Sequence, residues 1–237
     1  MNIVITGGSR GIGFHLAKNF VSMGNEVTIC ATNTNSLEEA LNQINVHGTV
    51  ADVRKSDDIK KLIDYAVNTM GSIDIWINNA GIGQYSVLCE MTEKQIEDVI
   101  DIDLTSVIRI CKILTARFDK IHIYNMEGFG SDGMLNPLMS VYGTSKRGLR
   151  YFSRALAKEF KKTDIKVSRL SPGMVRTDFL AKSGDYSKNK IMMKLSDEPE
   201  VVSQFLTRKV IKNTSSGNLI AWLTNVKAFM RILFRRI

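Results

Sequence analysis

The stretch NIVITGGSRGIG, residues 2–13, decides the fold of this chain. Its first five residues are mostly β-branched and apolar and run directly into glycines, which is typical of a buried strand. From residue 11 to residue 23 apolar side chains recur at helical spacing, and Gly24 follows as a helix-stop signal. A buried strand that turns tightly into a helix predicts the first half of a βαβ unit.

The same alternation continues to about residue 170. We expect further strands at 26–30, 48–51, 73–77, 120–124 and 166–170, and helices at 37–44, 57–70, 92–117 and 141–160. This order predicts parallel βαβ units with helices on both faces of the sheet. The predicted fold class is α/β: a Rossmann-like, doubly wound parallel sheet in a three-layer α/β/α sandwich, with residues 1–237 as a single domain. Residues 171–237 are expected to be an appendage of loops and helices.

The composition of the 237 residues is that of an ordinary globular protein. Hydrophobic residues make up 44% and charged residues 24%, which excludes global disorder and a fibrous repeat. The three cysteines, Cys30, Cys89 and Cys111, are far apart and lack the spacing of zinc ligands, so no metal site is expected. Unpaired cysteines, the lack of a signal-peptide pattern and the lack of an 18-residue apolar run predict a cytoplasmic protein without a spanning helix.

The formal net charge of +8 is concentrated in the last third of the chain. Residues 221–237 hold four basic side chains and no acidic one. Such an excess favours an anionic partner, which could be nucleic acid, a membrane surface or a small molecule. Because the sequence contains no nucleic-acid-binding motif, a nucleic-acid partner is not expected.

The glycine-rich turn after the first strand predicts a phosphate site. Glycines let the backbone turn tightly and approach a pyrophosphate, and the following helix directs its N–H groups at the anion. The residues of this predicted cradle are Gly7, Ser9, Arg10, Gly11, Ile12 and Gly13. A glycine-rich turn without a ligand is the alternative, but the position between a strand and a helix favours dinucleotide binding.

The end of the second strand indicates which dinucleotide is bound. An NAD site usually places a carboxylate there, whereas this chain has Thr32 and Asn33 and no acid before Glu38. A carboxylate would repel a 2′-phosphate, and Arg10 supplies a cation nearby. We therefore expect NADP(H) to be preferred over NAD(H).

Tyr142 and Lys146 form a candidate catalytic pair near the start of the helix at 141–160. Residues four apart lie on one helix face, and a nearby ammonium lowers the pKa of a tyrosine from about 10. Such a tyrosine could give a proton to a carbonyl oxygen. An ordinary pair on a helix surface is the alternative, which the upstream nucleotide cradle disfavours.

The sequence resembles the short-chain dehydrogenase/reductase family over essentially its whole length. The motifs that carry the resemblance are TGGSRGIG at 6–13, Asp52-Val53, Asn78-Asn79-Ala80-Gly81, Tyr142-x-x-x-Lys146, and Ser171-Pro172-Gly173 followed by Thr177. The resemblance implies Tyr142 as the proton donor, with Lys146 at the nicotinamide ribose. Further cofactor-binding residues are implied at the adenine (Asp52, Val53), the adenosine ribose (Asn79, Ala80, Gly81) and the nicotinamide (Pro172, Gly173, Val175, Thr177).

Two positions depart from the family pattern. Asp103 falls where the family carries an Asn that holds a water of a proton relay, and it is a candidate catalytic or structural residue. The family's catalytic Ser is replaced by Gly128 or Phe129. Ser131 is the nearest hydroxyl and is expected to orient the substrate carbonyl, unless it is only a turn serine.

These departures resemble the chlorophyll(ide) b reductase branch, through the loop HIYNMEGFGSDG at 122–133. The resemblance implies NADPH-dependent reduction of a carbonyl or formyl group on a hydrophobic small molecule to an alcohol. A relative that acts on another carbonyl is equally compatible with the sequence. The rival interpretation is a non-catalytic NADP(H)-binding sensor or a membrane-associated binding protein.

The C-terminal third is expected to contain a substrate lid at 178–198 and a basic amphipathic helix at 219–237. The lid's methionines suit a hydrophobic substrate, although plain packing is the alternative. The helix could contact an anionic membrane peripherally, or it could dock on the domain or on a second subunit. The family resemblance implies a homodimer or homotetramer through the helices at 92–117 and 141–160.

Overall fold

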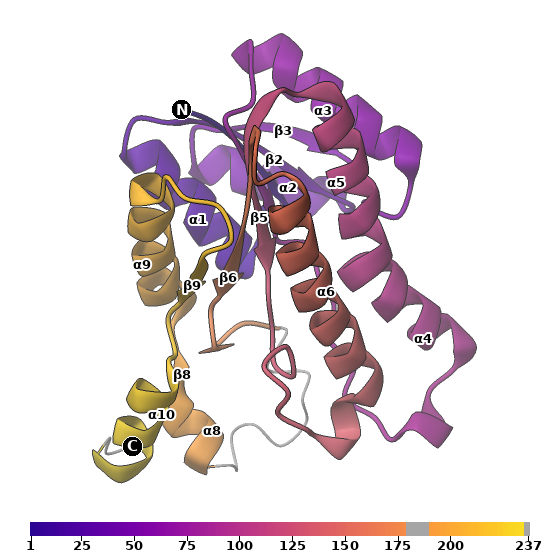
Figure 1. The fold of residues 1–237 in the computed structure, drawn as a ribbon, viewed down its shortest axis with the longest axis vertical. Coiled ribbons are helices and arrows are strands. Elements are labelled where there is room, and N and C mark those ends of the chain that lie inside the picture. Colours follow the sequence, from indigo (N-terminus) through magenta and orange to yellow (C-terminus); the bar gives the residue numbers. More distant parts are fainter. Residues whose placement is uncertain (179–189, 235–237) are drawn as a thin grey trace.

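The computed structural model describes residues 1–178 and 190–234. Its main sheet has seven parallel strands in the order β3-β2-β1-β4-β5-β6-β9 (Figure 1). These strands are β1 (Asn2–Thr6), β2 (Glu26–Ala31), β3 (His47–Val50), β4 (Ile75–Asn78), β5 (Lys120–Met126), β6 (Asp164–Ser171) and β9 (Leu219–Ala221). The predicted α/β fold class, with a doubly wound parallel sheet, is confirmed.

Helices cover both faces of this sheet. The larger helices are α1 (Gly11–Ser22), α2 (Thr34–Gln43), α3 (Ser56–Met70), α4 (Glu93–Ile100), α5 (Ser106–Arg117), α6 (Ser140–Glu159) and α9 (Pro199–Lys212). Core side chains of α1, α2 and α9 pack on one face, and those of α3, α5 and α6 pack on the other. The result is the predicted three-layer α/β/α sandwich.

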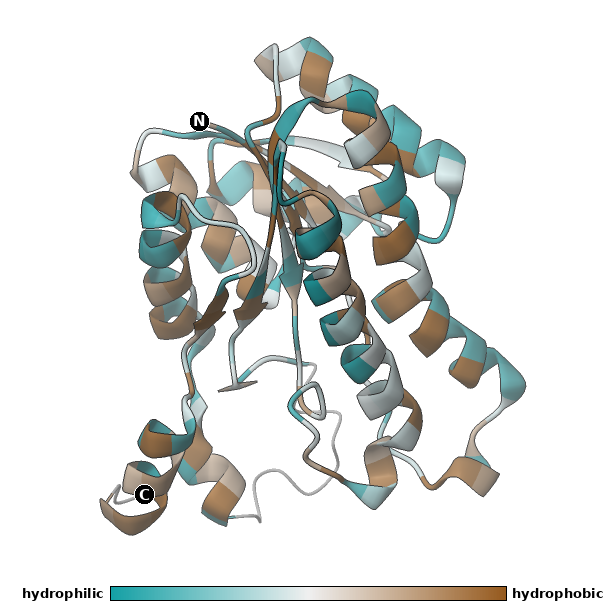
Figure 2. Cartoon of the chain, viewed as in Figure 1, coloured by the Kyte–Doolittle hydropathy of each residue, from teal (hydrophilic) through white to brown (hydrophobic). Residues whose placement is uncertain are grey.

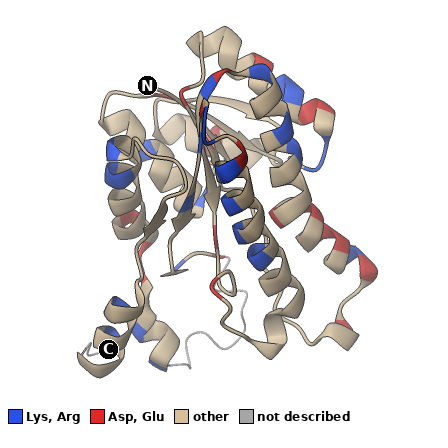
Figure 3. Ribbon diagram, viewed as in Figure 1, with Lys and Arg blue, Asp and Glu red and all other residues tan. Residues whose placement is uncertain are grey.

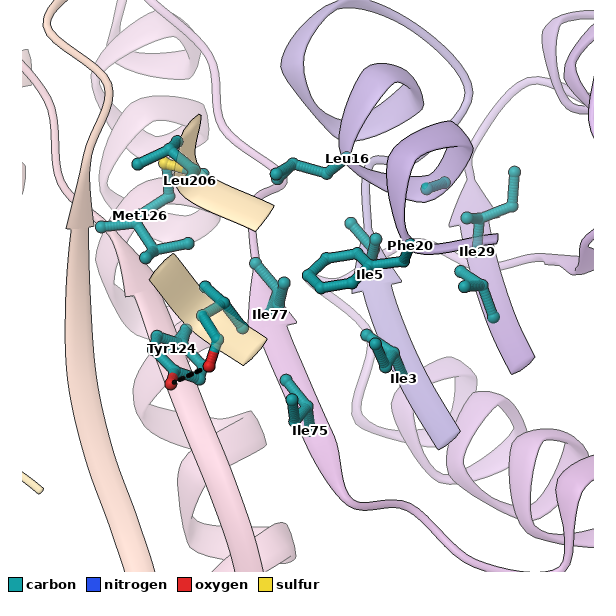
Figure 4. Packing of buried hydrophobic residues seen from close by; sticks show 14 of the residues in the cluster. Ile3, Ile5, Leu16, Phe20, Ile29, Ile75, Ile77, Tyr124, Met126 and Leu206 are labelled. Atoms are coloured by element: carbon teal, nitrogen blue, oxygen red, sulfur yellow. Dashed lines mark hydrogen bonds between the residues drawn. The ribbon is translucent and has the colours of Figure 1, made fainter. Parts of the chain in front are cut away.

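The first core layer shows why strand sequences are apolar throughout. Alternate residues Ile3 and Ile5 of β1 face Leu16 and Phe20 of α1, and all four side chains are fully buried (Figure 4). The residues between them face the other helix layer, since a sheet covered on both sides needs apolar side chains on both. Figure 2 shows largely brown strands at the centre of the molecule, enclosed by helices that carry both brown and teal residues.

The prediction that residues 171–237 form an appendage is wrong. β9 pairs with β6 as the seventh strand, and α9 packs beside α1 through the buried side chains of Val202, Leu206 and Val210. Each such side chain contributes about 1.5–3 kcal/mol by leaving water. The last third of the chain is therefore part of the core, and the fold continues through residue 221.

Two further predictions need correction. The helix predicted at 219–237 begins only at Asn225, because Leu219–Ala221 is β9; α10 spans Asn225–Phe234, and 235–237 lie outside the described residues. The helix predicted at 92–117 is interrupted by a π-helical segment, η2 (Asp101–Thr105). The shorter elements are η1 (Leu88–Glu90), η3 (Pro137–Met139), β7 (Met174–Val175), α8 (Lys190–Leu195) and β8 (Ser196–Asp197).

Of the predicted lid at 178–198, residues 179–189 lie outside the described residues. The remainder contains α8 and β8, and α8 lies beside α10 away from the sheet (Figure 1). Lys194 of α8 donates to the carbonyl of Ile232 on α10 at 2.9 Å. No helix in the described part of the chain combines the length and apolarity that a membrane span requires.

Candidate active site

The candidate site lies at the carboxyl ends of the strands, where the sheet order reverses between β1 and β4. Ligands of open α/β sheets bind at such a switch point. A cavity of about 940 Å³ opens there, within the range of small-molecule and cofactor sites. It is lined by all of the predicted cofactor residues: Gly7, Ser9, Arg10, Gly11, Ile12, Gly13, Thr32, Asn33, Asp52, Val53, Asn79, Ala80, Gly81, Tyr142, Lys146, Pro172, Gly173, Val175 and Thr177.

The glycine turn is packed so closely against the end of β4 that side chains would not fit. A Cβ on Gly13 would lie 2.3 Å from the Gly7 carbonyl oxygen, and one on Gly7 would lie 2.9 Å from the Ala80 Cα. Asn79 Nδ2 donates to the carbonyls of Thr6 and Gly7, each at 3.0 Å. This cradle fits a pyrophosphate, because the backbone is open to a ligand and α1 begins there with no acidic residue in its first turn.

The predicted adenine end of the cavity carries an arginine that sequence analysis missed. Arg54 Nε and NH2 bind the Asp52 carboxylate at 3.0 and 2.7 Å, and its NH1 binds Asp98 at 2.7 Å. The Arg54 hydrogen bonds hold the pKa of Asp52 below its usual value. Asn33, predicted near the 2′-phosphate of NADP(H), also caps α2 by accepting the Ser36 N–H at 2.9 Å.

The deep end of the cavity holds Tyr142 and Lys146, as the sequence predicts. Both lie on α6 and are buried, with 4% and 6% of their surface exposed, and Lys146 Nζ lies 5.6 Å from the Tyr142 ring centroid. The expected lowering of the tyrosine pKa is contradicted. Burial raises the pKa of Tyr142 well above its usual value, and the charges of Asp103 and Tyr85 add to that effect.

Asp103 explains why Lys146 does not lower the pKa of Tyr142. Its Oδ1 lies 3.6 Å from Lys146 Nζ and accepts the Ile82 N–H at 3.0 Å. The carboxyl group is fully buried in the π-helical segment η2, and burial raises its pKa against the opposing effect of Lys146. Oδ2 has no hydrogen-bond partner in the described residues. Lys146 lines the cavity, whereas Asp103 does not.

The loop after β5 places a glycine at the tyrosine hydroxyl. A Cβ built on Gly128 would lie 2.1 Å from Tyr142 Oη, and both Gly128 and Phe129 line the cavity. Of the two positions at which the family's serine was expected, Gly128 is therefore the one beside Tyr142. The hydroxyl of Tyr142 occupies the space in which a side chain at position 128 would begin.

Ser131 is not brought into the cavity with Tyr142. Its hydroxyl donates to Glu127 Oε2 at 3.2 Å, and the Glu127 carboxylate also binds Arg169 at 3.0 Å. The expectation that Ser131 orients the substrate carbonyl is not supported by this arrangement. Sequence analysis missed Glu127, because nothing in the local sequence indicates that this carboxylate pairs with an arginine far along the chain.

A family model described as short chain dehydrogenase matches residues 1–187. The chain belongs to the short-chain dehydrogenase family. Its curated relatives include the chlorophyll(ide) b reductase NOL of Arabidopsis thaliana, which is 33% identical over 99% of this chain and 73% of its own length. The 3-oxoacyl-[acyl-carrier-protein] reductase FabG of Chlamydia muridarum is 32% identical over 79% of each chain.

Solved structures show the same fold. Actinorhodin polyketide ketoreductase with NADPH has a TM-score of 0.84 and 22% identity, covering 95% of this chain and 97% of its own. A 3-ketoacyl-(acyl-carrier-protein) reductase from Brucella melitensis has a TM-score of 0.83 and 21% identity, covering 95% of this chain and 97% of its own. Family membership makes the protein an NAD(P)-dependent oxidoreductase that acts on carbonyl or alcohol groups.

Proposed function

We propose that the protein reduces a carbonyl or formyl group on a large, hydrophobic molecule to an alcohol with NADPH, as a chlorophyll(ide) b reductase does. The observation that carries this proposal is the buried Tyr142–Lys146 pair in the cavity that begins at the glycine cradle. The similarity to chlorophyll(ide) b reductases extends over 99% of the chain.

Tyr142 acts as the acid of this reaction. Because burial raises its pKa, the phenol stays protonated at neutral pH and has a proton to give. When bound, the nicotinamide supplies the hydride that adds to the carbonyl carbon. Tyr142 Oη then transfers its proton to the carbonyl oxygen, which yields the alcohol. Lys146 places a positive charge beside the phenol, and its ion pair with Asp103 holds it there.

The apolar side chains near Tyr142 support a hydrophobic substrate. Ile82, Tyr85 and Phe129 pack with Tyr142 and line the cavity, and Met192 of α8 joins them in the lining. Aromatic and thioether side chains suit a flat ring system.

NADPH oxidation with chlorophyllide b, and with a panel of aromatic aldehydes and ketones, tests the proposal. We expect oxidation with at least one aldehyde and its loss in Tyr142→Phe, with NADPH affinity nearly unchanged. A protein that binds NADPH but reduces no compound would instead be a non-catalytic binder.

The preference for NADP(H) is part of the proposal. The end of β2 offers Thr32 and Asn33 to the cavity, and Arg10 lies at its mouth with a highly exposed side chain, 4.0 Å from Asp178. An exposed pair of this length is weak, so a 2′-phosphate could attract the guanidinium. Arg10→Glu should weaken NADPH binding at least tenfold and leave NADH binding nearly unchanged. Equal losses of affinity for both cofactors would show that Arg10 does not bind the 2′-phosphate.

We also propose that α10 contacts a membrane peripherally. The contact depends more on insertion of its apolar side chains than on the charges of its basic ones. Phe229 and Phe234 are 62% and 69% exposed. The basic side chains of this helix are engaged within the protein, because Lys227 lies over the Trp222 ring and Arg231 pairs with Asp197. Figure 3 shows that α10 carries blue, basic positions and no red, acidic ones. Arg235 and Arg236, which follow α10 in the sequence, add charge complementary to anionic lipid.

Co-sedimentation with vesicles that contain phosphatidylglycerol tests the membrane contact. We expect Phe229→Ser to lower binding several-fold, whereas Val201→Ser, at an exposed apolar position on α9, should not. Equal binding by both variants would exclude α10 as the contact.

We further propose that the protein forms a homodimer or homotetramer through α4, α5 and α6. Its proposed location is cytoplasmic and reducing. Light scattering of the purified protein measures its mass. A monomer at micromolar concentration would contradict the proposed assembly.

A further inference from the structure

The loop at residues 127–131 is fixed before any substrate arrives. Glu127 is anchored by Arg169 through its side chain and by the Leu170 carbonyl through its N–H at 2.7 Å. The Ser131 N–H closes a turn onto the Gly128 carbonyl at 3.2 Å, and Arg147 donates to the Ser131 carbonyl at 3.0 Å. A group on this loop therefore needs little reorganisation to act on a bound substrate.

Three backbone N–H groups of this loop have no acceptor within the described residues, those of Gly128, Phe129 and Gly130, and the first two of these residues line the cavity. Gly128 lies directly beside Tyr142 Oη. Backbone N–H groups near buried surfaces are nearly always paired, so two unpaired ones beside the proposed acid indicate a ligand oxygen.

The direction of the Gly128 N–H follows from the strand that precedes it. The Glu127 N–H bonds β6, and successive residues of an extended strand direct their N–H groups to opposite sides. Glu127 and Gly128 directly follow Met126, the last residue of β5, and a chain that continues in extended form directs the Gly128 N–H away from β6, toward the side where β4 ends and the cavity lies.

We propose that the N–H groups of Gly128 and Phe129 bind and polarise the substrate carbonyl oxygen, in the role that a serine hydroxyl has elsewhere in the family. Hydride addition to the carbonyl carbon moves an electron pair onto this oxygen. The two N–H groups stabilise that negative charge until Tyr142 Oη transfers its proton to the oxygen. This inference rests on the proposed carbonyl reduction and names the groups that hold the reacting atom.

The turn itself provides a test. The hydrogen bond from Ser131 to Gly128, together with the φ of +86° at Gly130, is the geometry of a type II turn with Phe129 at its second position. Proline is favoured at that position and lacks an N–H. Phe129→Pro therefore removes the donor with little change of backbone, and Phe129→Ala is the matched control that removes only the ring.

Both variants are assayed with NADPH and the aldehyde of the panel that the wild type reduces fastest. We expect kcat of Phe129→Pro to lie about 10²-fold below that of Phe129→Ala, the usual effect of losing one such donor. NADPH affinity, measured by fluorescence titration, should be the same in both. Equal kcat values would overturn the assignment, whereas a wild type that reduces no aldehyde would overturn the proposed function itself.

Ser131→Ala keeps the inference testable if the proline variant does not fold. With the backbone as donor, loss of the Ser131 hydroxyl should lower kcat less than tenfold. A loss as large as that of Tyr142→Phe would show that the hydroxyl holds the carbonyl and would overturn the proposal.

Discussion

Replacement of Gly128 by alanine should displace the acid of the reaction. The new Cβ would lie 2.1 Å from Tyr142 Oη, whereas an ordinary contact is 3.4 Å or longer, so the hydroxyl or the loop must move by about 1 Å. A misplacement of that size costs roughly 10²-fold in rate. We therefore expect kcat of Gly128→Ala to fall about 10²-fold, while NADPH affinity changes little because the cradle at Gly7–Gly13 is untouched.

The assay compares kcat, NADPH affinity and thermal stability of Gly128→Ala with those of Gly143→Ala. Gly143 lies next to Tyr142 on α6, and a Cβ there would meet nothing within 4 Å. The control should keep its activity and gain up to about 1 kcal/mol of stability, because alanine replaces a helical glycine. Gly128→Ser, which restores the family's serine, should be as impaired as Gly128→Ala. Wild-type kcat in either Gly128 variant would show that a side chain at position 128 does not displace Tyr142 Oη.

Three other predictions concern charge and packing. Asp103→Asn removes a negative charge that raises the pKa of Tyr142, so the alkaline loss of reductase activity should move to lower pH; an unchanged pH–rate profile would contradict this. Burial lowers the pKa of His122 to about 4, so the unfolded chain binds its proton first as pH falls. His122 should contribute a drop of up to about 3 kcal/mol in the free energy of unfolding between pH 6.5 and 4, so the total drop in urea titrations should be smaller in His122→Asn. Leu206→Ala should destabilise the protein by about 2–5 kcal/mol in the same titrations, because α9 belongs to the core, and a loss below 1 kcal/mol would place α9 outside it.

The alternation of apolar runs with helical periodicity was sufficient to predict six strands and the helices between them. β9 was missed because three residues, Leu219–Ala221, carry too little pattern to separate a strand from the helical spacing that follows. Its pairing with β6 is a long-range contact that local periodicity cannot reveal. The π-helical turn around Asp103 was missed for a related reason. Its backbone hydrogen bonds span five residues instead of four, and this change leaves the spacing of apolar residues nearly unchanged.

The cofactor residues were predictable because their motifs follow strands whose carboxyl ends meet at one edge. The electrostatics around Tyr142 were not, since they depend on burial and on a partner 39 positions earlier in the chain. A lysine four residues from a tyrosine predicts a lowered pKa only if its charge is not already paired. Here Asp103 pairs with Lys146, and burial of the phenol has the larger effect.

Carbonyl reduction with Tyr142 as the acid can be tested by following the hydride from the cofactor into the product. The protein is incubated with chlorophyllide b and NADPH that carries deuterium at both positions of nicotinamide C4, and the product is examined by mass spectrometry. We expect one deuterium in a new hydroxymethyl group for the wild type and no product for Tyr142→Phe. Deuterated product from Tyr142→Phe at the wild-type rate would contradict the assignment of the acid, and unchanged chlorophyllide b with the wild type would contradict the proposed substrate.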